Sequence, residues 1–412
     1  MRDRLALFTA VWHKREYRAF FLIMVLLSLA ISSTLPLVTL YLVDHLHVGL
    51  SQVGFFFVGE ALLGLVLGLL VGRWSDHWRS RLPAMRLAAI WVALGWLVFA
   101  FSPYLWLTLP LGAIFFSAGA IIMGQGFAAL HDVMVRDGET EPGFINTTVR
   151  TGFSLGFVVG PLLGTELAAL VSFRAAFLIA GCFNLLCLVP LYGLDVHVSS
   201  AIQEEEKGRE QTQSNVLLYV FVALCTLALT GTALRITYLP IDVTKHLGGS
   251  ISLYGTVMAV SPIVELVAMP GVALLALRFR IGRLISFGLM VAAVEYLILC
   301  FNTALWQVYL TQVMDALVVA VVFGLGLTYA QQLARGRAGL ASSTFGSAFG
   351  MSILVGNLIG SVSIPFLGVP HIFFIPLVTS VMALAMFIAL DRTTAASQPA
   401  QNLGAPKREI PA

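Results

Sequence analysis

DVHVSSAIQEEEKGREQTQSN, residues 195–215, is the only long polar interval inside this chain. Six apolar runs long enough to cross a membrane precede it, and six more follow it. Its run of charged residues is typical of a solvated linker rather than of a binding element. The interval therefore predicts two six-span halves, residues 1–194 and 216–391, joined by the linker 195–215 and followed by a disordered tail at 392–412.

The composition is that of a membrane protein. Of 412 residues, 58% are hydrophobic and only 11% are charged, whereas soluble proteins have about 25% charged residues. This excludes a large soluble catalytic domain and a disordered chain. The four cysteines lie inside apolar runs without the spacing of a metal site, so we expect neither a disulfide framework nor a bound metal. The predicted spans cover residues 17–43, 51–71, 83–102, 106–130, 146–171, 174–193, 216–239, 251–276, 284–301, 306–331, 340–365 and 371–390.

Basic residues fall almost entirely on one side of the predicted membrane. With the N-terminus placed inside, 20 of the 24 Lys and Arg residues lie in inner segments, two (Arg174 and Lys245) lie outside, and two lie within spans. This bias follows the positive-inside rule. It predicts an even number of spans, with both termini and the linker in the cytoplasm. The orientation of the chain in the membrane thus explains where the basic residues lie, and we expect no nucleic-acid partner.

The turn after the second predicted span has the sequence GRWSDHWRSR, residues 72–81. Its carboxylate, Asp76, could pair with arginines and with a neighbouring helix N-terminus, and so latch two helical bundles together on the cytoplasmic side. The turn resembles the loop signature of the major facilitator superfamily: Gly72, Asp76 and Arg81 match it, and Arg79 replaces a glycine. The alternative is that the arginines only determine topology. The corresponding turn of the second half, 278–283, has no acid.

Glycines recur every four residues in the fifth predicted span, GFSLGFVVGPLLG, residues 152–164. Gly156, Gly160 and Gly164 form a smooth stripe that lets another helix approach closely, and Pro161 adds a kink. The run is similar to the antiporter motif of the same superfamily. We therefore expect this stripe to pack between the two bundles.

A closer resemblance is to the bacterial sugar efflux transporter family within that superfamily. It rests on Arg150 ahead of Gly160-Pro161, on Glu265 followed by Pro270, and on the segment 336–344. The resemblance implies an all-α membrane protein with twelve transmembrane helices in two pseudo-symmetric six-helix bundles, the major facilitator fold. It further implies a transporter of the bacterial inner membrane and not an enzyme. Such a transporter exports sugars or glycosides by alternating access, exchanges them for protons and needs no cofactor besides the proton gradient.

Seven charged residues lie at least four residues from either end of a predicted span, and a charge at a helix centre costs about 2.5 to 3.5 kcal/mol. We expect two of them, Glu166 and Glu295, to be interfacial or structural, and Arg235 to line the outer mouth. The other four, by the resemblance, lie on helices that face the central cavity or the seam between the bundles. These four candidates for proton coupling or substrate contact are Arg150, Glu60, Glu265 and Asp315.

Arg150 needs an acidic partner within the membrane. A carboxylate placed beside it could bind and release a proton as the cavity opens to each side. The sequence thus favours Glu265 or Asp315 as the proton carrier and Arg150 as the counter-charge.

A sugar site requires amide and carboxylate groups together with an aromatic face. The alternative for a buried Asn or Gln in a membrane helix is a bridge to a neighbouring helix. The spans offer five such candidates, Gln125, Gln312, Asn357, Tyr41 and Tyr238.

Two other functions stay open at this level. One is export of drugs, amino acids or other small solutes on the same scaffold, although Ala120 replaces the arginine found in the fourth span of drug antiporters. The other is an integral membrane enzyme or flippase, for which only His131-Asp132 offers neighbouring catalytic residue types. The chain has no phosphate-binding Gly-Lys-Ser/Thr loop for ATP, and we expect a monomer.

Overall fold

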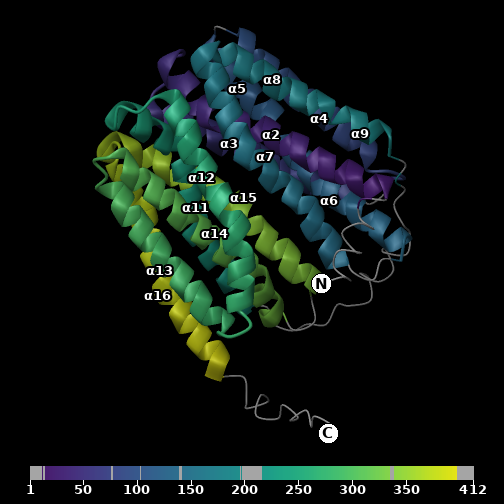
Figure 1. The fold of residues 1–412 in the computed structure, drawn as a ribbon, viewed down its shortest axis with the longest axis vertical. Helices are drawn as coiled ribbons and strands as arrows, with labels where there is room; N and C mark the ends of the chain where they lie inside the picture. Colours follow the sequence, from purple (N-terminus) through teal and green to yellow (C-terminus); the bar gives the residue numbers. More distant parts are fainter. Residues whose placement is uncertain are drawn as a thin grey trace.

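The computed structural model describes residues 12, 14–75, 78–102, 104–138, 142–194, 196, 216–334 and 338–396. In these residues, twelve helices are long and apolar enough to cross a membrane. The twelve predicted spans and the all-α fold are confirmed. Figure 1 shows the helices of the first half (purple to blue) lying beside those of the second half (green to yellow).

Six spans come from the N-terminal half. α5 and α6 together form the fourth span, and α8 and α9 form the sixth. The break between α8 and α9 has a local cause, because Pro190 has no N–H to donate to the carbonyl of Leu186. The helices are α2 (Arg15–Asp44), α3 (Leu50–Ser75), α4 (Leu82–Phe101), α5 (Leu105–Phe116), α6 (Gly119–Arg136), α7 (Pro142–Leu170), α8 (Phe173–Leu186) and α9 (Leu188–Tyr192).

Six further spans come from the C-terminal half. The first of them runs beyond its predicted end at 239, because the π-helical turn η1 continues it to His246. The last helix reaches Ala396, past the predicted domain boundary at 391, and the rest of the predicted tail lies outside the described residues. The elements are α11 (Val216–Ile241), η1 (Asp242–His246), α12 (Ile251–Leu275), α13 (Ile281–Cys300), α14 (Leu305–Leu333), α15 (Ala338–Leu367), η2 (His371–Phe373) and α16 (Phe374–Ala396).

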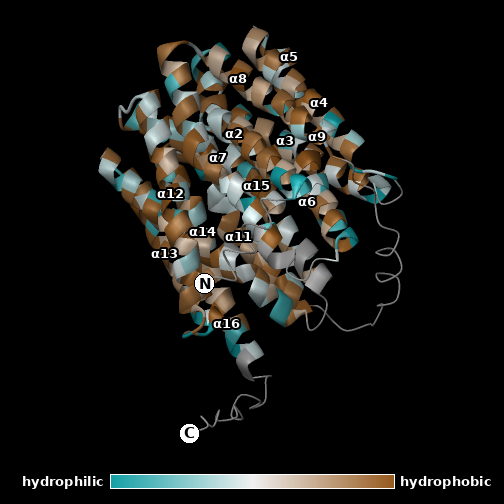
Figure 2. Cartoon of the chain, turned by 45° about the vertical axis from the view of Figure 1, so that its right-hand side comes forward, coloured by the Kyte–Doolittle hydropathy of each residue, from teal (hydrophilic) through white to brown (hydrophobic). Residues whose placement is uncertain are grey.

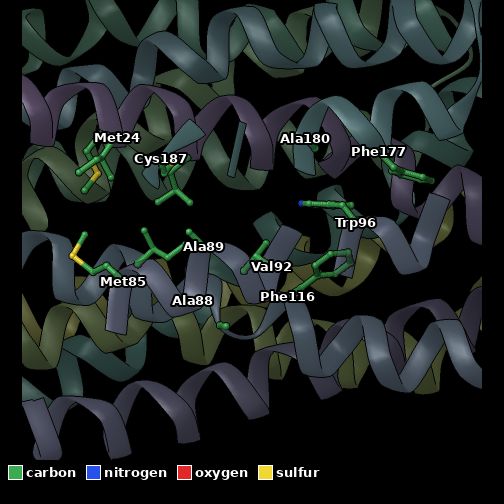
Figure 3. Close-up of a cluster of buried hydrophobic side chains, with 14 of the residues drawn as sticks. Met24, Met85, Ala88, Ala89, Val92, Trp96, Phe116, Phe177, Ala180 and Cys187 are labelled. Carbon is green, nitrogen blue, oxygen red and sulfur yellow. The ribbon is translucent and has the colours of Figure 1, made fainter. Parts of the chain in front are cut away.

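Each half has its own apolar core. In the N-terminal bundle, Trp96 of α4 packs with its ring parallel to that of Phe177 of α8, and Phe116 lies on its other side (Figure 3). Many large hydrophobic residues are also exposed at the surface of the helices, and Figure 2 shows hydrophobic positions, coloured brown, along the helices of both halves. A surface of this kind is stable only in lipid, so the fold is that of a multi-pass membrane protein.

The glycine stripe of α7 packs against α2 within the N-terminal bundle. A Cβ added at Gly156 or Gly160 would collide with Ser28 or Ser32 of α2, and one at Gly164 would collide with the backbone of Ser33. The Ser32 hydroxyl donates to the carbonyl of Gly156 at 2.9 Å. The prediction that this stripe packs between the bundles is wrong, since the helix it admits so closely belongs to the same bundle.

The two bundles meet along α2 with α11, α3 with α15, and α7 with α12. At the end far from the linker this seam is tight: Ser51 Oγ donates to the carbonyl of Ser361 at 2.6 Å, and Lys245 pairs with Asp44 at 2.9 Å. Toward the linker, a Cβ added at Gly68 or Gly346 would meet nothing within 4 Å. The bundles are therefore joined at the far end and draw apart toward the end that carries the linker (Figure 1).

Candidate functional site

A cluster of buried charges occupies the C-terminal bundle. Arg235 of α11 forms an ion pair with Glu295 of α13 at 3.1 Å and is in direct contact with Asp315 of α14. The side chains are 8%, 1% and 14% exposed, in that order. Arg235 also donates to Gln312 Oε1 at 2.7 Å, and Gln312 and Asp315 share one face of α14 because they are three residues apart. Three helices thus converge on one guanidinium.

Ser261 of α12 connects this cluster to Glu265. Its hydroxyl lies 2.7 Å from Asp315 Oδ2 and 3.2 Å from Glu265 Oε1. A serine hydroxyl has one proton, so it donates to one carboxylate at a time. Both contacts are hydrogen bonds at once only when one of the two acids is protonated and donates to Ser261. The arrangement is therefore suited to hold one proton between Glu265 and Asp315.

Arg150 lies on α7, on the opposite side of the seam. Its charge attracts that of Glu265, but in the part of the chain that the structure describes it forms no ion pair. Glu265 is thus the acid whose charge acts on Arg150, and the two side chains belong to different bundles.

One expectation about a single charge is wrong, because Arg235 does not line the outer mouth but lies buried between two acids. Glu295 is 1% exposed and paired with Arg235, which agrees with the structural and not with the interfacial alternative. The sequence held one signal for this pairing. Five charged residues lie within the spans of the C-terminal bundle and at the seam, and none has an oppositely charged partner on its own helix, so each must pair with a residue of another helix. Glu166 is exposed near the far end of α7, whereas Glu60 is half-buried on α3 and has no hydrogen bond or ion pair to described residues.

The five candidate sugar ligands are spread over the molecule. Asn357 accepts from Thr237 Oγ1 at 2.6 Å and donates to the carbonyl of Ile353, so Asn357 bridges α15 to α11, as Gln312 bridges α14 to α11. Gln125 is buried and accepts from Arg81 at 3.3 Å. The two tyrosines are buried apart from this group: Tyr41 packs on Phe99 and Phe177, and Tyr238 lies at the tight end of the seam beside Gly54.

The predicted cytoplasmic latch is described only in part. Asp76 lies outside the described residues, Gly72 lies in open space and Arg79 is exposed. Arg81 is 11% exposed and donates to Asp132 at 2.9 Å and to Ser75 at 2.8 Å. These contacts of Arg81 stay inside the N-terminal bundle and tie α3 and α6 to the start of α4.

The pairing of Asp132 with Arg81 also bears on the enzyme alternative. Asp132 is 2% exposed, whereas His131 next to it is exposed. Their side chains point in different directions, and among the described residues no group of His, Cys, Asp and Glu could hold a metal ion.

Further ion pairs stand at the linker end of each bundle. Asp137 pairs with Lys14 at 3.3 Å and with Arg136 at 2.9 Å. Partial burial acts to raise the pKa of Asp137, but the hydrogen bonds from these two cations outweigh it and hold the pKa below its usual range. In the C-terminal bundle, Asp391 of α16 lies 3.7 Å from Arg280. The acid missing from the turn 278–283 is thus supplied by the last span.

Known proteins resemble this chain in sequence and in fold. The family model described as Major Facilitator Superfamily matches residues 20–241 and 220–411. Sugar efflux transporter A of Dickeya chrysanthemi is 26% identical over 84% of this chain and 88% of that protein. Sugar efflux transporter B of Salmonella typhimurium is 24% identical over 83% and 87%. Multidrug resistance protein MdtG of Proteus mirabilis is 25% identical over 52% of each chain.

Among solved structures, the nucleoside transporter NupG superposes with a TM-score of 0.72 at 10% identity, over 92% of this chain and 100% of that one. A peptide transporter POT in complex with sulfate superposes with a TM-score of 0.74 at 13% identity, over 93% and 94%. At such identities these likenesses concern the fold alone.

Proposed function

This chain belongs to the major facilitator superfamily, and we propose that it exports sugars or glycosides across a bacterial inner membrane in exchange for protons. It is a transporter and not an enzyme. The sugar is supported by the relatives named sugar efflux transporters, which match along four fifths or more of their length. The proton is supported by the site.

The observation that carries proton exchange is the hydroxyl of Ser261 between Glu265 and Asp315. Both acids lie deep within their spans: Asp315 is ten residues from the start of α14, and Glu265 fourteen from the start of α12, or about 15 and 21 Å at 1.5 Å per residue. An acid at that depth is costly to keep ionised. One of the pair carries the proton, and Ser261 passes it between them.

Arg150 acts as the counter-charge that changes with conformation. It lies in the N-terminal bundle, whereas Glu265 lies in the C-terminal bundle, so rocking of the bundles changes their separation. An approaching guanidinium favours the ionised carboxylate and releases the proton. Departure of Arg150 favours proton uptake, which links the proton to the side of the membrane that is open.

The seam supports a cytoplasm-facing state. The bundles are joined at the end where Lys245 pairs with Asp44 and draw apart at the linker end. The excess of basic residues favours a cytoplasmic linker. With a monomer as the transporting unit, this state takes up sugar from the cytoplasm. Glu60, Gln125, Asn357, Tyr41 and Tyr238 remain proposed sugar contacts, reached as the helices rearrange.

The test is transport of a panel of labelled sugars and glycosides by the purified protein in liposomes, with and without an imposed pH gradient. We expect at least one sugar to accumulate against its concentration gradient in the more acidic compartment, because protons leave that compartment as sugar enters it, and the accumulation to collapse with a protonophore. Gradient-driven movement of drugs or amino acids, without movement of any sugar, would favour the second candidate, which the partial match to a multidrug resistance protein supports.

A further inference from the structure

A fully buried carboxylate, that of Asp242, lies at the far end of the C-terminal bundle, outside the network around Ser261. Asp242 is the first residue of the π-helical turn η1 and is 0% exposed. Its Oδ1 lies 3.0 Å from Nδ1 of His246, and its Oδ2 accepts from the amide of Asn302, which follows α13. Among the described residues, the only ion pair of Asp242 is with His246, which is 34% exposed.

The carboxylate of Asp242 has a matching charge only when His246 is protonated, because the amide of Asn302 is neutral. An acid buried without a cation is costly, and the partial negative charge at a helix C-terminus adds to that cost. The same partial charge favours a cation on His246, which lies in the last turn. Histidine is the residue type whose charge changes between about pH 5 and pH 8. The pair is therefore suited to respond to the acidity of the compartment at the far end.

The turn that this pair anchors also carries a contact that closes the far end. Lys245, next to His246 in η1, pairs with Asp44 of α2 in the other bundle at 2.9 Å. Such π-helical turns are rare and occur frequently at functional sites. Asp242 anchors this one through its carboxylate and through its carbonyl, which accepts from the N–H of Leu247 at 2.9 Å. The position of Lys245 thus depends on the anchoring of Asp242.

We propose that His246 and Asp242 form a pH-sensitive switch for the far end of the seam. Protonated His246 holds Asp242 and with it the π-helical turn, so that Lys245 reaches Asp44 and the bundles stay joined there. When His246 loses its proton, Asp242 is left without a cation, the turn relaxes and the closing ion pair is lost more readily. Acid on the far side thus favours a closed far end, and a rise in pH favours opening.

The other charged and titratable groups around this pair are few. On the neighbouring elements they are Arg235 of α11, Tyr254 of α12, Glu295 of α13, and Asp44 and His45 at the end of α2. Arg235, seven residues before Asp242, is paired with Glu295, and His45 stacks on an aromatic ring of its own bundle. A tyrosine is neutral near pH 7. Of the described groups, His246 is therefore the one placed to give Asp242 a partner whose charge depends on pH.

The place of this switch in the transport cycle rests on the proposed proton exchange, whereas the switch itself does not. With the linker in the cytoplasm, the far end faces the compartment that supplies the protons. Once sugar has left on that side and a proton has been bound, the far end must close. Acid in that compartment both loads the carrier and protonates His246, so closure follows loading.

The test is the distance between spin labels on Trp106→Cys and Trp306→Cys. Both positions are exposed and stand at the far-end start of the fourth span of their half. Cys182, the exposed one of the four native cysteines, is replaced by serine. Pulsed electron resonance of the purified full-length protein, from about pH 5 to pH 8, gives the ratio of the short, closed distance to the longer, open one.

We expect the closed-to-open ratio of the wild type to exceed that of His246→Gln about two- to fivefold at the acid end of this range and to equal it at the alkaline end. The upper bound follows because an exposed ion pair changes an equilibrium by no more than about fivefold. Comparing the two proteins at one pH separates His246 from Glu265 and Asp315, which both proteins retain. His246→Lys, which keeps a cation, stays closed at the alkaline end as well. His45→Gln is the matched control and follows the wild type.

Equal ratios for the wild type and His246→Gln at the acid end overturn the proposal. The effect of His246→Gln should also vanish in a Lys245→Gln or an Asp242→Asn background, because the switch acts through these two residues. An effect that persists in either background overturns the proposal too. If Asp242→Asn does not fold, the background of exposed Lys245 decides. The spin-label readout needs no transport, so a failure of proton exchange in liposomes is distinguishable from a failure of the switch.

Discussion

At the scale of single residues, two kinds of buried arginine occur in this protein. Among the described residues, Arg81 is paired with Asp132 and bonded to the neutral side chains of Ser75 and Gln125. Arg235 is paired with two acids, one of which also contacts Ser261. The first arrangement is suited to hold helices together. The second has an excess acid and is suited to exchange a proton.

Neutralising the proton carrier should uncouple transport. Of Asp315→Asn and Glu265→Gln, we expect the variant that removes the carrier to abolish sugar accumulation driven by a pH gradient and to spare exchange of labelled for unlabelled sugar, because exchange moves no net proton. The other variant should weaken coupling, because it removes the acid that shares Ser261 with the carrier. Arg150→Lys should be poorly tolerated, since an ammonium keeps the charge but lacks the planar fork. Wild-type accumulation and pH dependence in both acid variants would remove these residues from the coupling mechanism.

Breaking the Arg81–Asp132 pair should instead cost stability. Asp132→Asn removes the buried carboxylate that accepts from Arg81, and we expect a loss of about 3 kcal/mol, at the lower end because Ser75 and Gln125 still accept from Arg81. The loss is read as a lowered thermal unfolding temperature of the purified protein in detergent. Arg79→Gln, at an exposed position in the same turn, should leave that temperature unchanged. A similar loss in both variants would mean that the turn and not the pair is responsible.

At the scale of helices, two helices approach closely where one of them has glycine in place of a larger residue. α7 can lie against α2 because glycines stand wherever α2 presents a serine or its backbone. Pro161 and Thr165, in the same stretch of α7, contact Gly255 of α12 in the other bundle. One helix therefore serves both the interior of its bundle and the seam, and a shift of α7 would alter both contacts.

A methyl group in this contact should be destabilising. In Gly164→Ala the new Cβ meets the Ser33 backbone, which cannot rotate away as a side chain could, and we expect a loss of about 1 to 3 kcal/mol. Gly68→Ala on α3 is the matched control. Its Cβ meets nothing within 4 Å, so the change should be neutral or stabilising by up to about 1 kcal/mol, because alanine is the better helix former. Thermal unfolding of the two variants should differ in sign; equal effects would contradict the packing argument.

At the scale of the whole molecule, the closed and open ends of the seam define one state of a transport cycle. The closing contacts include an ion pair and a hydroxyl-to-carbonyl bond. Exposed ion pairs contribute only about 0 to 1 kcal/mol each. Contacts of this strength can be made and broken in every cycle, as alternating access requires.

Locking the closed end should stop transport. We expect a cross-link between cysteines in Ser51→Cys/Ser361→Cys, which join α3 to α15, to abolish transport, and a reducing agent to restore it. Each single cysteine variant, treated in the same way, should transport normally and thereby control for the four native cysteines. Full transport by the cross-linked protein would show that this end need not open.

The spans, their division into two halves, and the identity of the buried charged residues follow from the sequence, because hydropathy and the cost of a charge in lipid are properties of a short segment. The pairing of those charges does not. These helices are apolar nearly all round, so no stripe marks the face that turns inward, and the rotation of each helix about its axis is fixed only when neighbours pack. For this reason tertiary structure alone decided that Arg235 lies between Glu295 and Asp315, that Arg81 faces Asp132, and that the glycines of α7 face α2.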